Sequence, residues 1–215
     1  MEVSSFRRFN TIDVLCGSSP RKNSCFLEEA NNLGKVFAKK QIHLVHGGGC
    51  LRLMGRIAGS AYLEGVKVLG VIPKSLSRHI TSETIGDELR VLNMQDRMVN
   101  MMNNVDAVIT LPGGFGTLEE LFQMVFWAQL NTHQKPIGIL SVNGFFDGLL
   151  LFLDYAVKKG FISPPGRRII ICATTPNELT DKLQAYIHEP NPIVAHIVWP
   201  QDTCRKRKLD LSLTL

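Results

Sequence analysis

The sequence has few cysteines and no long apolar run, and each shortage excludes a class of protein. Its 5 cysteines among 215 residues are odd in number and include no C-x-x-C pair, which favours a reduced intracellular protein over a disulfide scaffold. No apolar run approaches the roughly 20 residues that a spanning helix needs. The start, M-E-V-S-S-F-R-R-F-N, lacks the apolar core of a signal peptide. We therefore expect a cytoplasmic protein with no membrane partner.

The sequence also lacks a large net charge of either sign. The net charge is only +5, and part of it lies in the run R-K-R-K at positions 205–208. The positive charge that remains is too small for a nucleic-acid-binding face, so we expect no nucleic-acid partner. The basic run could be a nuclear import signal, which would add the nucleus as a location, although a solvated basic tail is the commoner explanation.

The sequence offers no recognisable metal or pyridoxal site. Its 6 histidines show neither the H-E-x-x-H spacing nor a pattern of cysteine partners, so we predict no catalytic metal. No lysine stands in a context typical of a pyridoxal Schiff base.

What the sequence does contain is a regular alternation of short apolar runs with segments of helical periodicity. Strands are predicted at residues 12–16, 42–45, 67–72, 107–111, 136–140 and 169–172. Helices are predicted at residues 24–39, 53–63, 94–103, 117–130, 146–158 and 176–187. This order predicts an α/β fold, a Rossmann-like doubly wound parallel sheet with helices on both faces.

Length and composition favour one domain. Hydrophobic residues make up 45% of the chain and charged residues 20%, as in ordinary globular proteins. We place a single nucleotide-binding domain at residues 11–188, after an N-terminal extension at 1–10. Beyond it, prolines and the basic run break all periodicity, so residues 189–215 are predicted to form a poorly ordered tail.

Residues 106–120, D-A-V-I-T-L-P-G-G-F-G-T-L-E-E, are the stretch around which the chain is organised. The pattern predicts a strand, a glycine loop and a helix that opens at Thr117. Gly113, Gly114 and Gly116 can take positive φ and have no Cβ, so a ligand can approach their backbone N–H groups. The helix start adds unpaired N–H groups and the positive end of its dipole, which favour a phosphate or another anion.

Two acids follow this loop, and they are unusual neighbours for a phosphate. Carboxylates in a first helical turn often only complement the dipole, and that explanation is open for Glu119. Glu120 falls one position further along, where its side chain can point back over the loop. A carboxylate that faces a sugar phosphate suggests glycosidic chemistry.

The nine residues P-G-G-F-G-T-L-E-E at 112–120 resemble the P-G-G-x-G-T-x-x-E signature of the LONELY GUY (LOG) family of cytokinin riboside 5'-monophosphate phosphoribohydrolases. V-H-G-G-G-C-L-R-L-M-G at 45–55 resembles the family's second glycine motif, and the similarity extends over about residues 12–186. Members of this family were long labelled lysine decarboxylases, a label that nothing in this sequence supports.

The resemblance implies a set of substrate-binding residues in the two glycine motifs and in the polar connection at 73–93. These are Gly48, Gly49, Met54, Glu83, Pro112, Gly113, Gly114, Phe115, Gly116 and Thr117. Glu83, in T-S-E-T-I-G-D, resembles the family's G-E-T-x-G segment, although a solvated loop acid explains it equally well. The family usually has Ser and Gly where this chain has Cys50 and Arg52, which puts affinity or substrate range in question.

Arg97 matches the arginine of the family's Met-x-x-Arg-Lys pattern in M-Q-D-R-M at 94–98. A lone arginine is usually a surface or ion-pair residue, but the resemblance implies a catalytic role for Arg97 together with Glu120. Its planar guanidinium suits a phosphate, a ribose or a carboxylate. Met98 stands where the family has lysine, so one cationic donor is expected to be missing from the site.

The resemblance implies an enzyme that hydrolyses the N-glycosidic bond of a nucleoside monophosphate, namely an adenine nucleotide with an isoprenoid-type group on the exocyclic amine. No cofactor is expected, and the family implies a homodimer with its sites at the interface. A binding module of the same fold, such as a nucleotide sensor or a carrier of a phosphate-bearing cofactor, is the alternative.

Overall fold

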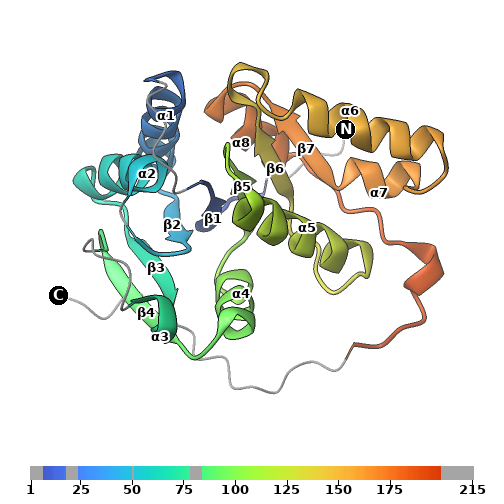
Figure 1. Cartoon of the computed structure of the whole chain (residues 1–215), viewed down its shortest axis with the longest axis horizontal. Coiled ribbons are helices and arrows are strands. Elements are labelled where there is room, and N and C mark those ends of the chain that lie inside the picture. Colours follow the sequence, from blue (N-terminus) through green and yellow to red (C-terminus); the bar gives the residue numbers. More distant parts are fainter. Residues whose placement is uncertain (1–6, 18–23, 50, 78–83, 200–215) are drawn as a thin grey trace.

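The computed structural model describes residues 7–17, 24–49, 51–77 and 84–199. Within them, seven parallel strands form one sheet in the order β4-β3-β2-β1-β5-β6-β7. The strands are β1 (Thr11–Leu15), β2 (His43–His46), β3 (Val68–Pro73), β4 (Asp87–Val91), β5 (Ala107–Thr110), β6 (Ile137–Leu140) and β7 (Ile170–Ala173). The strand order reverses at β1, which lies between β2 and β5 (Figure 1). The predicted Rossmann-like parallel sheet is confirmed.

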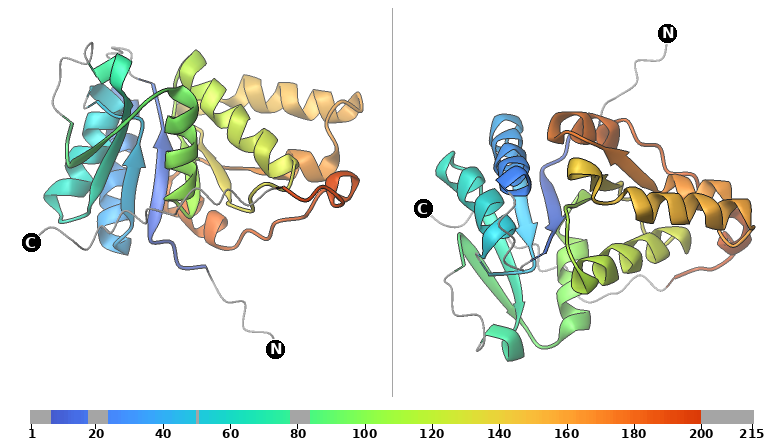
Figure 2. Two further views of the ribbon diagram at one scale, coloured as in Figure 1. Left: turned by 90° about the horizontal axis from the view of Figure 1, so that it is seen from below. Right: turned by 45° about the horizontal axis from the view of Figure 1, so that its top comes forward.

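Helices cover both faces of the sheet (Figure 2). They are α1 (Ser24–Lys40), α2 (Arg52–Leu63), α3 (Lys74–Ser77), α4 (Met94–Asn103), α5 (Phe115–Gln129), α6 (Asp147–Lys158), α7 (Pro164–Arg168) and α8 (Pro176–Gln184), with 3-10 turns η1 (Val142–Gly144) and η2 (Pro192–Val194). Successive side chains of β1 point to opposite faces. Ile12 and Val14 therefore pack with α1, α2 and α8, while Leu15 packs with α4, α5 and α6. None of the described helices is both long and apolar enough to cross a membrane.

The long connection predicted at residues 73–93 is not a plain loop. The structure forms α3 at its start and β4 near its end, where β4 pairs with β3 at the edge of the sheet. The sequence of β4, D-E-L-R-V, is mostly polar and exposed. An edge strand has one neighbour and need not be apolar on both faces, which is why no apolar run marked it.

Helix α5 starts two residues earlier than predicted, at Phe115 with Gly114 as its N-cap, and not at Thr117. Consequently no acid lies in its first turn. Both Glu119 and Glu120 lie further along the helix, so the explanation that Glu119 complements the dipole from the first turn is wrong.

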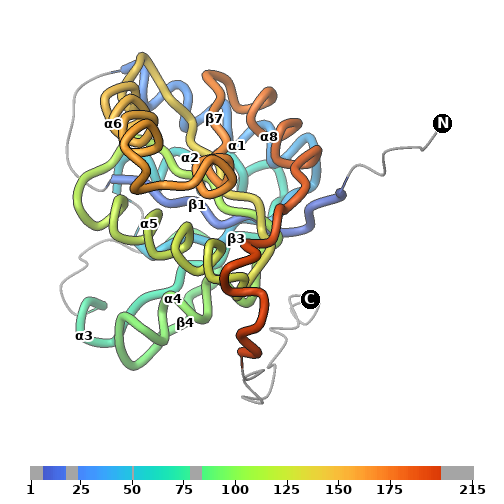
Figure 3. The backbone as a smooth tube through the Cα atoms, turned by 90° about the vertical axis from the view of Figure 1, so that its right-hand side faces the viewer, coloured from blue at the N-terminus to red at the C-terminus, as the bar shows by residue number. Residues whose placement is uncertain are grey.

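Part of the predicted tail, residues 189–199, lies against the end of α5 (Figure 3). Asn131 and Asn191 exchange hydrogen bonds of 3.0 and 2.9 Å between side chain and backbone. The Trp199 indole Nε1 donates to the Leu130 carbonyl oxygen at 2.8 Å. The basic run at 205–208 lies outside the described residues, and the domain boundaries stay a prediction.

Candidate active site

Two loops meet at the carboxyl ends of the central strands. The chain leaves β5 through Leu111, whose N–H bonds the Leu15 carbonyl oxygen at 2.8 Å, and then turns at Pro112. The Gly17 N–H donates to the Pro112 carbonyl oxygen at 3.1 Å. A Cβ on Gly17 would lie 2.9 Å from the Cα of Gly113, so glycine lets the two backbones approach. The end of β1 and the predicted phosphate loop are therefore held together.

The glycines of the 112–117 loop serve different purposes. A Cβ on Gly113 would collide with the buried side chain of Thr117, whereas Cβ atoms on Gly114 and Gly116 would meet no atom within 4 Å. None of the three has positive φ, so this loop does not use that freedom of glycine. Gly114 and Gly116 are exposed at the start of α5. Space and unpaired helix N–H groups are thus present there for an anion.

The second glycine loop does use positive φ, at Gly48 (83°) and Gly49 (79°). A Cβ on Gly48 would collide with the side chain of Ile72. A Cβ on Gly47 would collide with Nη2 of Arg97, so this loop lies directly over the guanidinium. Below it, the buried His46 accepts a 3.1 Å hydrogen bond from the Gly48 N–H through Nδ1. Burial and the charge of Arg97 lower the pKa of His46 to about 4, so it is neutral.

Arg97 and Glu120 form a buried ion pair beneath these loops. Arg97 donates through Nη1 to Oε1 of Glu120 and through Nε to the Val71 carbonyl oxygen at 3.2 Å. The two residues are 7% and 8% exposed. Burial raises the pKa of Glu120, while the charge of Arg97 and its hydrogen bond oppose that rise. The two residues predicted to be catalytic come from α4 and α5 and are in contact.

A third ionisable residue, which no sequence motif marked, belongs to the same part of the fold. Asp13 in the central strand β1 is 0% exposed, and neither of its carboxylate oxygens has a hydrogen-bond partner among the described residues. Burial, and then the charge of Glu120, raise its pKa well above the ordinary value. Burial, Glu120 and Asp13 also raise the pKa of Cys16 to about 12, which keeps that thiol neutral. An aspartate inside the apolar strand T-I-D-V-L was the signal that could have identified it.

Comparison with known proteins identifies the family. The family model described as possible lysine decarboxylase matches residues 54–183, more than half of the chain. The cytokinin riboside 5'-monophosphate phosphoribohydrolase LOG7 of Arabidopsis thaliana is 46% identical over 195 residues, which cover 90% of each chain. The chain belongs to the LOG family. A relative of Oryza sativa subsp. japonica, named as a probable enzyme of the same activity, is 45% identical over 196 residues, 91% of this chain and 78% of its own.

Solved structures share the fold of this LOG-family chain at lower sequence identity. The molybdenum cofactor binding protein of Rippkaea orientalis superposes with a TM-score of 0.62 at 20% identity, covering 84% of this chain and 98% of its own. The Moco carrier protein of Chlamydomonas reinhardtii has a TM-score of 0.58 at 19% identity, covering 79% of this chain and 92% of its own. At such identities the likeness shows the fold alone.

The predicted substrate-binding residues of the LOG-family chain fall into three groups. Around the Arg97–Glu120 pair the structure gathers the glycine loops, the buried Pro112 and the buried Thr117, with Phe115 93% exposed at the start of α5. Met54 is not gathered there, because its side chain packs in the apolar cluster of α1 and α2. Glu83 and Cys50 lie outside the described residues.

Arg52, which replaces the family's glycine, has a left-handed backbone with φ of 59° at the start of α2. A side chain in this conformation costs roughly 1–2 kcal/mol, which glycine avoids. We expect Arg52→Gly to raise the free energy of unfolding by about 1 kcal/mol, measured by urea denaturation. Arg56, exposed on the same helix, supplies the control, since Arg56→Gly should lower stability by about 1 kcal/mol. If Arg52→Gly lowered the free energy of unfolding as much as Arg56→Gly does, Arg52 would not be strained.

Met98, predicted to leave one cationic donor missing from the site, has a buried side chain in the structure. Its side chain is 2% exposed and packs in the apolar cluster with Val91 and Met101. A lysine here would carry an ammonium into that cluster. We now expect Met98→Lys to lower the free energy of unfolding by about 2–4 kcal/mol, measured by denaturation, with no gain in nucleotide affinity. Val99→Lys, on the exposed side of α4, should be nearly neutral. Tighter nucleotide binding by Met98→Lys would instead show that a cationic donor is missing from this position.

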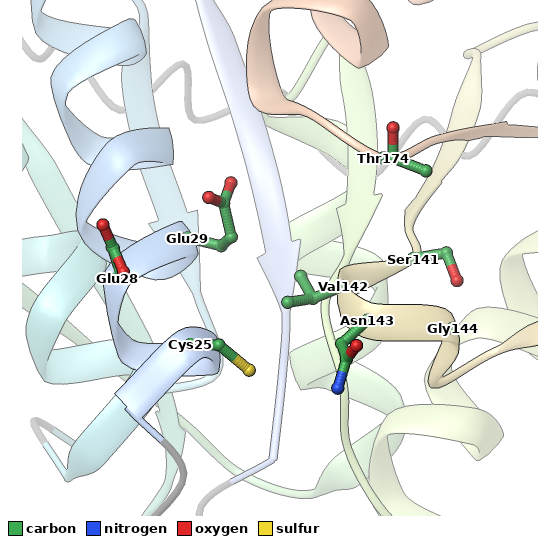
Figure 4. A pocket seen from close by; sticks show the side chains of 8 residues that line it. All are labelled: Cys25, Glu28, Glu29, Ser141, Val142, Asn143, Gly144 and Thr174. Carbon is green, nitrogen blue, oxygen red and sulfur yellow. The ribbon is translucent and has the colours of Figure 1, made fainter.

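A separate cavity of about 540 Å³ opens at the carboxyl ends of β6 and β7 (Figure 4). It lies between the first turns of α1 and the turn η1. Its lining residues are Cys25, Glu28, Glu29, Ser141, Val142, Asn143, Gly144 and Thr174. Neither Arg97 nor Glu120 lines it, so it is separate from that ion pair.

Proposed function

We propose that this LOG-family chain is a cytokinin-activating phosphoribohydrolase. Its substrate is a cytokinin riboside 5'-monophosphate, an adenine nucleotide with a substituent on its exocyclic amine, and its products are the free base and ribose 5-phosphate. The observation that carries the proposal is the buried Arg97–Glu120 pair beneath two glycine loops. The curated relatives named for this activity support it.

The 5'-phosphate is assigned to the start of α5 and the two glycine loops. The first N–H groups of α5 have no acceptor within the helix, which begins its ladder with the 3.0 Å bond from Leu118 N–H to the Gly114 carbonyl oxygen. Gly114 and Gly116 leave open space at these groups. Hydrogen bonds from backbone N–H groups and the helix dipole stabilise a dianion without a dedicated side chain.

Glu120 and Arg97 are assigned to the chemistry. As the bond between the anomeric carbon and the base nitrogen breaks, positive charge develops on the ribose, and the Glu120 carboxylate stabilises it. Glu120 also accepts a proton from the water whose oxygen bonds to the anomeric carbon, while the departing base takes a proton from solvent. Arg97 fixes the carboxylate through Nη1 and is itself held by the Val71 carbonyl oxygen and by Gly47 packing above it.

Base release from a panel of nucleoside monophosphates tests the proposal. We expect free base from N-substituted AMP, slower release from AMP, and none from the nucleoside without phosphate at the same concentration. Tight nucleotide binding without release of any base would favour the alternative of a binding module of the same fold. Weak binding of every nucleotide would overturn both.

We propose further that the protein is a homodimer in which α5 lies at the interface. The inner side of α5 carries Glu120, and its outer side exposes large apolar residues, namely Phe115, Phe122 and Phe126. Helix α6 adds the exposed residues Leu151, Phe152 and Tyr155. A monomer rarely exposes so many neighbouring aromatic side chains without a partner.

Light scattering measures this assembly. We expect a particle of twice 24.0 kDa at micromolar concentration. Phe126→Glu places a charge in the apolar surface and should weaken the dimer by at least tenfold, about 1.4 kcal/mol. The control is Leu63→Glu, at an apolar residue at the end of α2 that is 85% exposed, against 56% for Phe126. A fully active monomer, or equal effects of the two substitutions, would refute the interface.

The cytoplasm is the proposed location, with the nucleus added if the basic run at 205–208 acts as an import signal. A fluorescent fusion compared with the same fusion carrying alanines at these four positions decides between the two. Loss of a nuclear fraction in the alanine variant would support import. Identical distributions would show that the basic run is only a solvated tail.

A further inference from the structure

Asp13 occupies a position where a carboxyl group is unexpected. It lies in the middle of the central strand, opposite Val45 of β2 and Val108 of β5. Both valines, and Leu15 two residues along β1, pack in the apolar cluster of α4, α5 and α6. Because alternate residues of a strand share a face, the carboxyl of Asp13 points to that same side of the sheet.

Helices α4 and α5, which carry Arg97 and Glu120, pack on that same side of the sheet. Helix α5 contacts β1, and α4 contributes Arg97 through its contact with Val71 of β3. Neither oxygen of Asp13 has a hydrogen-bond partner among the described residues. An unpartnered buried carboxylate costs several kcal/mol, and a third valine would avoid this cost.

The charged neighbours of Asp13 come from three elements. Glu120 of α5 acts on it most strongly, followed by Arg97 of α4, and Lys135, before β6, acts least. Lys135 is already engaged, since its ammonium donates to the carbonyl oxygens of Met102 and Val105. The facing residues of β2 and β5 are valines, and the neutral Cys16 packs with Ile12 and Val14 on the opposite face of the sheet.

We propose that Asp13 is a positioning residue that holds a proton beneath the Arg97–Glu120 pair, so that Arg97 has only one carboxylate to bind. The inference rests on the proposed function of that pair. Glu120 accepts the hydrogen bond of Arg97 and therefore stays ionised, whereas Asp13 has no charged donor among the described residues and only the backbone of Val14 near its carboxyl, so Asp13 keeps the proton. Because Glu120 is the charge that acts most strongly on Asp13, the two carboxyl groups titrate as a coupled pair.

Ionisation of Asp13 would change the site in two ways. A second carboxylate would compete for the guanidinium of Arg97 and loosen its hold on Glu120. It would also increase the proton affinity of Glu120, because like charges in a buried site repel. Asp13 therefore determines the upper end of the pH range in which Glu120 is both ionised and fixed.

The pH dependence of kcat/KM for base release tests this role. In the wild type we expect kcat/KM to fall by about tenfold per pH unit above the pH at which Asp13 ionises. Asp13→Asn keeps the shape of the side chain but cannot ionise, so this alkaline fall should disappear. Asp96→Asn, which removes a half-buried carboxylate next to Arg97 in the first turn of α4, should keep it. Asp13→Val, which matches the neighbouring valines, gives the same test if the asparagine variant does not fold.

A second readout does not depend on activity. In the wild type, the ¹³C carboxyl resonance of Glu120 should show two inflections with pH, its own and a second one when Asp13 ionises. In Asp13→Asn only one should remain. A single Glu120 inflection in the wild type, or an alkaline fall of kcat/KM that is unchanged in Asp13→Asn, would overturn the inference. Two inflections in a protein that releases no base would refute the proposed function and leave the coupling intact.

Discussion

Replacing Glu120 by glutamine is expected to lower turnover by about a hundredfold or more while nucleotide affinity changes little. Glutamine keeps the size and most hydrogen bonding of the side chain but removes its charge and its ability to accept a proton. The phosphate is assigned to the glycine loops and the start of α5, so binding does not depend on this carboxylate. Base release and nucleotide binding are measured in parallel on the same preparations.

Glu119 supplies the matched control for this experiment. It precedes Glu120 on α5 but is exposed. Glu119→Gln should therefore change turnover by no more than about twofold. Since Glu120 must be ionised to act, turnover should fall as the pH drops through its pKa, which burial raises. Undiminished turnover in Glu120→Gln would remove the catalytic assignment and leave the binding module in its place.

Replacing Arg97 by alanine is expected to damage binding, turnover and stability together. The guanidinium is the partner of Glu120, supports the Gly47 loop and bonds the Val71 carbonyl oxygen. Its removal leaves a buried carboxylate without a cation, which typically costs about 3–5 kcal/mol of stability. Turnover should fall by about a hundredfold or more, and nucleotide affinity should fall with it because the loop loses its support.

Two further variants separate these effects of Arg97. Arg97→Lys keeps the charge but not the planar fork, so it should recover stability more than turnover. Arg90→Ala removes an exposed arginine that pairs with Glu88 on the edge strand and should leave turnover unchanged. In the double variant Arg97→Ala with Glu120→Gln, the losses of turnover should be far from additive because the two side chains act as a unit. Additive losses would show that they act independently.

Elements with strong local sequence signals were predicted well. Features that depend on packing against other parts of the fold were not. Strand β5 and its glycine loop were marked by β-branched residues, Pro112 and three glycines. Strand β4 was missed because an edge strand with the sequence D-E-L-R-V has no apolar periodicity. The start of α5 was placed two residues late, since Phe115 follows a glycine and carries no capping signal of its own. Met98 was interpreted as a missing ligand donor because its burial depends on how α4 packs.

Hydrophobic periodicity predicted the fold class and the order of most elements, because it is a local property of the chain, and the resemblance to the LOG family pointed to Arg97 and Glu120. The contacts between these residues depend on how the helices pack on the sheet, which no local pattern encodes. Arg97 and Glu120 meet because α4 and α5 cover the same face of the sheet beside β1. Asp13 enters the same site because the alternation of β1 turns it toward that face, where burial deprives it of water and of any donor among the described residues. The electrostatic character of the site arises from this convergence of side chains that lie far apart in the sequence.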